Sequence, residues 1–204
     1  MIRLFVGLEL PTATRQALAL LRGGVDGARW QTDAQYHLTL RFIGEVETRR
    51  AGEIADALGR IRFAPFALDI EGLGVFGKLR KPRALWAGVR DPAPLKHLHE
   101  KIDQALDRVG IAPETRKYRP HVTLARFRGR CARLERYLVD HRDFATPRIT
   151  VDHFALFSSH LGHEGARYVV EARFAASGVE AVEDAFDLAE IAAAEETDMH
   201  KERP

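Results

Sequence analysis

The sequence lacks the features of a membrane protein, of a secreted disulfide-bonded protein and of a cysteine-bound metal protein. It has one cysteine, Cys131, so no disulfide forms within the chain and a cysteine-based metal cage is not supported. No apolar run approaches the roughly 20 residues that span a bilayer. The opening residues 1–9 are too short and charged too early for a signal peptide. We therefore expect a cytoplasmic protein with no membrane partner.

What the chain contains is typical of a soluble globular protein, with 46% hydrophobic and 29% charged residues. Its net charge of +2 hides an uneven distribution, because residues 178–204 hold nine acids and two bases. Residues 1–177 therefore carry a net charge of +9. We expect a domain over residues 1–177, built as one unit or two small lobes, and an acidic tail over residues 178–204 that is partly helical or disordered.

The basic body favours an anionic partner such as a nucleic acid or a nucleotide. Arginine supplies most of the positive charge, and its planar guanidinium suits phosphate recognition. A composition that is merely rich in arginine produces the same excess, so charge alone does not decide between these interpretations.

Hydrophobic periodicity and turn residues predict alternating strands and helices. Strands are expected over residues 2–8, 36–43, 66–73, 84–89, 120–127, 149–158 and 166–174, and helices over residues 12–21, 48–60, 95–109 and 132–139. Residues 74–83 combine glycines with bases and are expected to form a loop. The order of strand, helix, strand, helix and strand pair then recurs, which indicates an internal duplication. Antiparallel pairs mixed with helices predict an α+β fold.

A repeated tetrad is the most informative feature of the sequence. His37-Leu-Thr-Leu40 returns as His121-Val-Thr-Leu124, 84 positions later. For this composition, two such tetrads arise by accident about once in a thousand chains. Because side chains alternate along a strand, the histidine and threonine of each copy share one face while the aliphatic residues occupy the other. Two half-buried strands with a polar side are the structural alternative.

Two facing imidazoles can divide acid and base work. Histidine titrates near neutral pH, so one ring can accept a proton while the other donates one. In-line displacement at phosphorus needs both transfers, because the nucleophile loses a proton as the leaving oxygen gains one. Thr39 and Thr123, beside the two histidines, can donate hydrogen bonds to the phosphate oxygens.

Two arginines follow the tetrads and are candidate substrate-binding residues. Arg41 shares the parity of His37 along a regular strand and is expected on the same face. Arg126 lies an odd number of residues from His121, so a regular strand turns it away. A bulge or a strand end near Ala125 is required to bring Arg126 to the phosphate.

Other catalytic chemistries have weaker support. Two histidines can ligate a metal, but neither tetrad has an acid two or four residues on to complete the ligand set. We therefore predict no metal site and no cofactor. Cys131 has no evident partner that makes it a nucleophile. The remaining histidines are expected to be structural or at the surface; His160 and His163, in a loop between the last two predicted strands, are the ones nearest to an exception.

The paired tetrads resemble the H-x-T-x signature of the 2H phosphoesterase superfamily. Within it the chain is similar to the RNA 2′,3′-cyclic phosphodiesterases, long called 2′-5′ RNA ligases. The resemblance covers about residues 1–175 and includes RLFVGLELP (3–11), LTLRFIG (38–44), GLGVFG (72–77), PRALWAG (82–88), RPHVTLAR (119–126) and FSS (157–159) before RY (167–168). The acidic tail lies outside it.

The resemblance implies a fold and a reaction. The fold is bilobal α+β, with two pseudo-symmetric lobes, mostly antiparallel sheets and one motif strand from each lobe at a central cleft. The reaction is metal-independent hydrolysis of a 2′,3′-cyclic phosphate at an RNA end, which leaves a 2′-phosphate. Carried over to this chain, His37 is the proton donor, His121 is the proton acceptor, and Thr39 and Thr123 hold the phosphate. The pseudo-symmetry makes the two histidine roles formally exchangeable. A monomer is expected.

Three alternatives stay open at the level of the sequence. The same site can ligate a cyclic end to a 5′-hydroxyl, because only the nucleophile changes. The basic body can bind RNA without catalysis, with salt-sensitive affinity that does not depend on the histidines. The substrate can also be a small cyclic nucleotide instead of an RNA.

Overall fold

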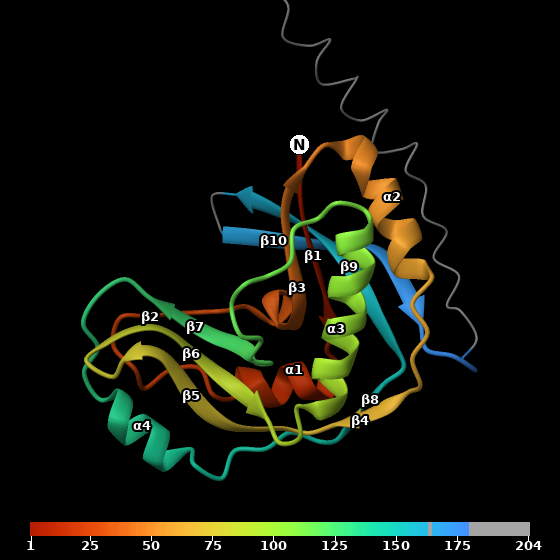
Figure 1. Cartoon of the computed structure of the whole chain (residues 1–204). Helices are drawn as coiled ribbons and strands as arrows, with labels where there is room; N and C mark the ends of the chain where they lie inside the picture. The colour runs from red at the N-terminus through yellow and green to blue at the C-terminus, as the bar shows by residue number, and fades with distance from the viewer. Residues whose placement is uncertain (163–164, 180–204) are drawn as a thin grey trace, which may run out of the picture.

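The computed structural model describes residues 1–162 and 165–179, which form ten strands and four α-helices. Figure 1 shows them in chain order. The helices are α1 (Thr12–Ala19), α2 (Thr48–Gly59), α3 (Ala93–Arg108) and α4 (Leu134–Asp140), and a 3-10 turn, η1, covers Asp33–Gln35. The strands are β1 (Ile2–Glu9), β2 (Ala28–Trp30), β3 (His37–Val46), β4 (Phe66–Leu68), β5 (Ile70–Lys78), β6 (Lys81–Val89), β7 (Val122–Phe127), β8 (Ile149–Val151), β9 (His153–Gly162) and β10 (Gly165–Ala175).

One antiparallel sheet organises the molecule, in the order β10-β9-β1-β3-β7-β6-β5, with β2 paired to β7. Strands β4 and β8 form a separate two-stranded sheet. The tetrad strands β3 and β7 are neighbours at the centre of the order, and a single residue pair, Leu38 with Val122, joins them. The sheet is therefore two half-sheets that meet at the tetrads: a first half β10-β9-β1-β3 and a second half β7-β6-β5 with β2. This α+β architecture confirms the predicted fold class.

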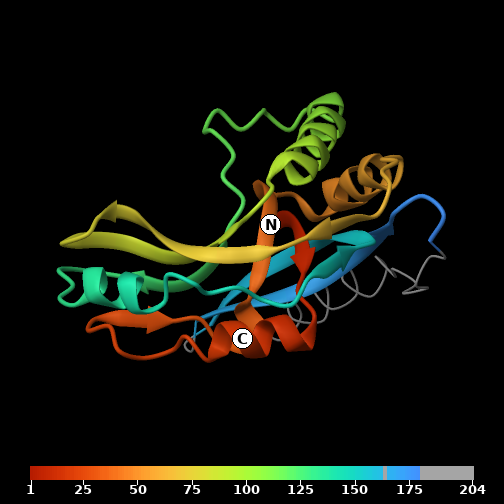
Figure 2. The same ribbon diagram turned by 90° about the horizontal axis from the view of Figure 1, so that it is seen from below.

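Helices α2 and α3 pack against each other, and α4 is linked to the segment that follows α1. Helix α3 contacts β3, and α2 contacts α3 and β10. The Tyr137 hydroxyl of α4 donates to the Leu21 carbonyl, just beyond the end of α1. The Tyr137 ring lies 6.0 Å from the Trp30 ring of β2. Figure 2 shows α2 and α3 at one side of the molecule, with α1 and α4 towards the other. Within the described residues, no helix has both the length and the apolarity needed to cross a membrane.

The core lies on one face of the sheet. Leu4, Val6 and Leu8 of β1 alternate into the main hydrophobic cluster and are almost completely buried. Phe5, between them, points to the other face, where it packs with Phe157 in a separate small cluster. The second cluster underlies the face that carries the histidines.

The first tetrad strand contains a bulge. Gly7 of β1 pairs with Thr39, but the preceding residue, Val6, pairs with Arg41, so Leu40 has no partner on β1. Two successive side chains, Leu40 and Arg41, are consequently both buried on the core side. The alternation of faces shifts by one residue after the tetrad.

The second tetrad strand contains the same irregularity at the corresponding position. Trp86 of β6 pairs with Thr123 and Leu85 pairs with Ala125, so Leu124 has no partner on β6. Leu124 and Ala125 are both fully buried. The duplication suggested by the tetrads therefore extends to the backbone geometry that follows them.

Four expectations drawn from local sequence patterns were wrong in detail. His160 lies in β9, paired with Arg167 of β10, and not in a loop. Residues 66–73 are not one strand but β4 and the start of β5, which belong to different sheets. Residues 149–158 divide in the same way into β8 and β9. Residues 74–83 are not a loop, because all but the two turn residues extend β5 and β6 into a hairpin. Trp86 covers Gly74, so a side chain does not fit at this position: a Cβ at Gly74 would come within 2.2 Å of the indole ring. The helix predicted in the acidic tail lies outside the described residues.

Candidate active site

The pairing of β3 with β7 brings the two tetrads together. Because Leu38 and Val122 are partners in an antiparallel pair, Thr123 lies opposite His37 and Thr39 lies opposite His121. The two histidines are then diagonal neighbours, which in a regular sheet are about 7–8 Å apart. We call the face that carries these four side chains the histidine face. All four are partly exposed, whereas Leu38 and Val122 between them are fully buried.

His37 is held by the backbone and by aromatic rings. Its Nδ1–H donates to the Gln35 carbonyl at 2.8 Å. The Phe5 ring lies 4.9 Å from the imidazole, and the Tyr168 ring lies 4.8 Å away edge-on. Burial lowers the pKa of His37 to about 4, with smaller contributions from the positive charges of Arg126 and His121. The neutral ring therefore presents an unprotonated Nε2.

His121 has an equivalent arrangement. Its Nδ1–H donates to the Arg119 carbonyl at 2.6 Å, which fixes the same tautomer. Phe76 lies edge-on at 4.8 Å and Trp86 at 6.3 Å from the imidazole. Burial also lowers the pKa of His121, and the charge of Arg126 lowers it further. Each histidine thus donates one ring N–H to a carbonyl two residues earlier, and within residues 1–162 and 165–179 its other ring nitrogen has no hydrogen-bond partner.

Arg126 is brought to the histidine face by the bulge in β7. Because Leu124 and Ala125 both point to the core, Arg126 emerges on the same face as Thr123. Its charge lowers the pKa values of His37 and His121, and it acts on the pKa of Tyr168 in the same direction. The charge of Arg126 therefore acts on both imidazoles and on the Tyr168 hydroxyl. The bulge near Ala125 that sequence reasoning required is present.

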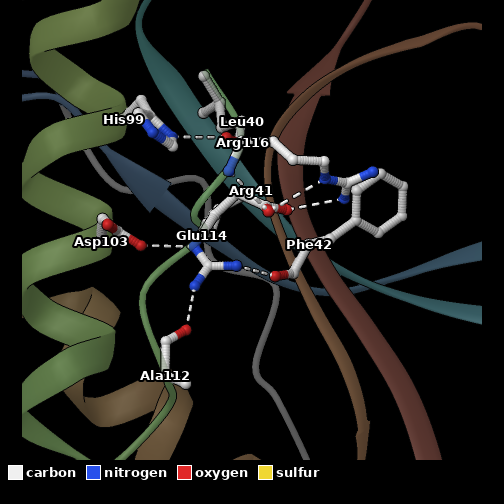
Figure 3. A network of polar contacts seen from close by, with 8 residues as sticks. All are labelled: Leu40, Arg41, Phe42, His99, Asp103, Ala112, Glu114 and Arg116. Carbon is white, nitrogen blue, oxygen red and sulfur yellow. Dashed lines mark hydrogen bonds and ion pairs between the residues drawn. The ribbon is translucent and has the colours of Figure 1, made fainter. Parts of the chain in front are cut away.

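Arg41 does not lie on the histidine face, so the expectation from strand parity was wrong for this residue. The bulge in β3 turns its side chain into the protein, where it is 5% exposed. Its Nε donates to Asp103 of α3 at 2.5 Å, and its terminal nitrogens donate to the carbonyls of Phe42 and Ala112 (Figure 3). Phe42 takes the vacated position and is 50% exposed, with its ring 5.8 Å from Phe5.

The bulge in β3 is also held from the core side. His99 of α3 donates from Nδ1 to the Leu40 carbonyl at 2.8 Å, and the Tyr118 hydroxyl donates to the Thr39 carbonyl at 3.2 Å. The rings of His99 and Tyr118 stack at 4.2 Å. The segment that leads into the second tetrad therefore contacts the backbone of the first.

Sequence reasoning missed the aromatic side chains around the imidazoles. Phe5, Phe76, Trp86 and Tyr168 come from four strands, and no local pattern connects them. Their only signal was that each lies in a segment that carries the family resemblance.

Cys131 and the metal-ligating side chains are the other chemistry-bearing groups of the chain. Burial raises the pKa of the Cys131 thiol, which disfavours the thiolate. In the part of the chain that the structure describes, no group of three or more His, Cys, Asp or Glu side chains is arranged to hold a metal ion.

A cavity of about 360 Å³ is lined by Glu9, His153, Arg173 and apolar side chains of β1 and β8. Two of its lining residues, Leu8 and Glu9, pair with Leu38 and His37 of the first tetrad strand. Hydrogen bonds from His153 and Arg173 outweigh partial burial and hold the pKa of Glu9 at about 2. Glu9 is therefore paired with His153 and Arg173. The histidines and threonines of the tetrads do not line this cavity.

Comparison with known proteins agrees with this geometry. The model of the family described as LigT-like phosphoesterase matches residues 8–86 and again residues 89–168. Each match contains one tetrad. The duplication inferred from the sequence is therefore a property of the family model as well.

The curated relatives share one description. The chain is 36% identical over 151 residues to the RNA 2′,3′-cyclic phosphodiesterase of Aeropyrum pernix, covering 72% of this chain and 86% of the relative. It is 35% identical over 146 residues to the protein of the same name from Thermotoga maritima, covering 71% and 77%.

Two solved structures are also similar to this chain. The E. coli LigT complexed with 3′-AMP matches with a TM-score of 0.69 and 26% identity, covering 86% of this chain and 98% of that one. The protein TT0787 of Thermus thermophilus matches with a TM-score of 0.71, 26% identity and the same coverage.

Proposed function

Because this chain belongs to the LigT-like phosphoesterase family, we propose that it hydrolyses the 2′,3′-cyclic phosphate at an RNA end to a 2′-phosphomonoester. The curated relatives carry the name of that activity. In this proposal the reaction needs no metal ion, and the two tetrads supply the acid and the base. It takes place in the cytoplasm and uses no cofactor.

The proposal depends mainly on one observation: the two imidazoles are in the same tautomer and make the same kind of backbone hydrogen bond. Each donates Nδ1–H to a carbonyl two residues earlier and leaves Nε2 free on the histidine face. They lie diagonally across the Leu38–Val122 pair with a threonine opposite each. This arrangement suits a tetrahedral phosphorus group that exchanges one oxygen for another between the two rings.

The proton transfers follow from this placement. A water oxygen attacks phosphorus and gives its proton to Nε2 of His121 as the bond from phosphorus to O3′ breaks. Nε2 of His37 gives a proton to O3′, and the phosphate stays on O2′. The assignment of donor and acceptor comes from the family resemblance. Burial keeps His37 neutral in the free protein, so its protonation relies on the negative charge of the bound phosphodiester, which raises the pKa of a nearby imidazole.

The other groups on the face stabilise the charge that develops on the phosphate. In this proposal Thr39 and Thr123, which lie opposite His121 and His37, donate hydroxyl hydrogen bonds to the non-bridging oxygens. Arg126 adds a positive charge beside both rings. Donors and cations fixed before the reaction need no reorganisation in the transition state, which makes them effective.

The test uses an RNA oligonucleotide that ends in a 2′,3′-cyclic phosphate, incubated with the full chain in EDTA. We expect a 2′-phosphomonoester as the product. His37→Ala and His121→Ala are each expected to lower kcat by about 10²–10⁴-fold, the usual contribution of one positioned acid or base. His97→Ala, an exposed histidine of α3, is the matched control.

Three outcomes contradict the proposal. They are a 3′-phosphomonoester product, loss of activity in EDTA, and histidine variants as active as His97→Ala. Addition of an RNA with a 5′-hydroxyl separates hydrolysis from ligation, because a joined product instead of a monoester shows that the alcohol replaces water as the nucleophile.

A further inference from the structure

The far end of the second half-sheet is a concentrated positive surface. We call Lys78, Arg80, Lys81 and Arg83, at the turn between β5 and β6, the hairpin bases; all four are exposed. We propose that the hairpin bases bind the phosphodiester backbone of an RNA whose cyclic end lies at the histidines. The substrate is then an oligonucleotide and not a mononucleotide, and the strand leaves over β7, β6 and β5. This inference rests on the proposed function and specifies its substrate.

The surface contains no negative charge of its own. Residues 72–90 hold five bases and no acid, and residues 115–134 hold seven bases and no acid. These stretches form most of β5, all of β6 and β7, and the segments on either side of β7. The net charge of +9 on residues 1–177 is therefore concentrated on the second half-sheet.

The side chains of the hairpin bases have no partner among the described residues, whereas several other bases of this chain are paired. Arg41 is paired with Asp103, Arg148 with Asp69 and Arg90 with Glu71. No side-chain hydrogen bond or ion pair connects Lys78, Arg80, Lys81 or Arg83 to any group in residues 1–162 and 165–179. Their charge is left to act on an external anion. This charge forms no ion pair within the described part of the chain.

The hairpin bases are continuous with the active site. Arg126 pairs with Arg29 on β2 and with Ala84 on β6, and Ala84 pairs with Phe76 on β5. This row of paired residues crosses the second half-sheet from Arg126, on the histidine face, to Phe76 on the edge strand β5. Lys78 lies two residues beyond Phe76, about 7 Å along an extended strand.

The combination of aromatic rings and bases favours a nucleic acid over other anions. Phe76 and Trp86 lie next to His121, and the bases follow further out. Single strands are bound by grooves or faces that combine ring surfaces for the bases with positive charge for the backbone. On the first half-sheet, Arg173 is engaged with Glu9.

The experiment compares two substrates and two triple variants. The substrates are 2′,3′-cyclic CMP and an eight-residue RNA with a 2′,3′-cyclic phosphate end. Lys78→Gln, Arg80→Gln and Lys81→Gln are combined in one protein. The control combines Arg60→Gln, Lys96→Gln and Arg108→Gln, which removes the same charge from exposed, unpaired positions at α2 and α3 among the described residues.

The hairpin variant is expected to lose about tenfold in kcat/KM for the RNA at low salt, mainly through KM. The slope of log kcat/KM against log salt concentration is expected to become shallower by about 2, since each contact with a single strand contributes about 0.7. Turnover of cyclic CMP stays within twofold of the wild type, and the control variant resembles the wild type on both substrates.

Equal effects of the hairpin and control variants on the RNA overturn the inference. So does a hairpin variant that loses as much on cyclic CMP as on the RNA. The failure of the proposed function is distinguishable, because in that case the wild type hydrolyses neither substrate. Binding of the eight-residue RNA with a 3′-phosphate end, measured by fluorescence anisotropy, then still reports whether the hairpin bases contact the strand.

Discussion

At the scale of single residues, the two imidazoles are kept neutral by burial and by one neighbouring cation. Arg126 lowers the pKa of both His37 and His121. A positive charge near an imidazole opposes its protonation, so removing that charge makes protonation easier. In the proposed mechanism, the arginine that stabilises negative charge on the phosphate therefore also adds to the effect of burial on the pKa of both histidines.

Arg126→Gln is expected to raise the pKa of both histidines. An NMR titration that follows the imidazole Cε1–H signals measures the two values separately. Loss of the cation beside the phosphate is also expected to lower kcat/KM by about 10²-fold, with Arg126→Lys retaining more activity than Arg126→Gln. Arg108→Gln, at an exposed position on α3, is the control. A pKa that falls or stays constant in Arg126→Gln contradicts the placement of the guanidinium beside the rings.

At the scale of elements, the bulge after each tetrad decides which side chains reach the site. Strand alternation alone put Arg41 on the histidine face and Arg126 away from it. The bulges reverse both assignments. A bulge depends on the partner strand and on what covers the displaced side chain. Arg41 is held by Asp103 and by the Ala112 carbonyl, more than 60 residues away, so a local sequence pattern cannot predict its orientation.

The same argument applies to the β5–β6 hairpin. Considered alone, the glycines of this segment are typical of a loop. Gly74 is instead the position over which Trp86 lies, and that contact exists only once the two strands have paired. The helices, by contrast, were predicted well, because their amphipathic spacing is a local property of the chain.

Asp103→Asn tests whether α3 holds the first bulge. Arg41 is 5% exposed and the Asp103 side chain 24%, so removing the carboxylate charge leaves a buried guanidinium without its counterion. Because Asp103 retains some contact with water, we expect a loss of about 2 kcal/mol in the free energy of unfolding, below the range for fully buried pairs. Urea denaturation measures it, and Asp107→Asn, exposed one turn further along α3, is the control. Equal stability of the two variants shows that the ion pair does not support the strand.

At the scale of the whole molecule, two half-sheets meet along one residue pair and share one site. The sequence predicted this organisation because the tetrads and the order of elements both repeat. It did not predict the single link between Leu38 and Val122, since pairing across 84 residues leaves no local trace. The division into a domain over residues 1–177 and a tail over residues 178–204 stays a prediction, as does the monomeric state.

The distribution of charge over the whole chain leads to a last prediction. Residues 178–204 carry −7 and residues 1–177 carry +9, so the tail neutralises most of the body's charge. We expect the tail acids to compete with RNA for the basic surface. Truncation after Ser177 keeps the hydrogen bonds that Ala176 and Ser177 donate to Asp152 and Phe63. It is expected to tighten RNA binding at low salt, and the gain is expected to shrink at high salt, where exposed charges are screened.

Fluorescence anisotropy with a 3′-phosphate-ended RNA at low and high salt measures the effect. The control is a full-length chain in which the nine tail acids are replaced by Asn or Gln, which removes the charge but keeps the segment. If competition is electrostatic, the neutralised tail tightens binding as much as truncation does. If only truncation tightens binding, the segment acts by covering the surface, and if neither does, the tail has no influence on the RNA site.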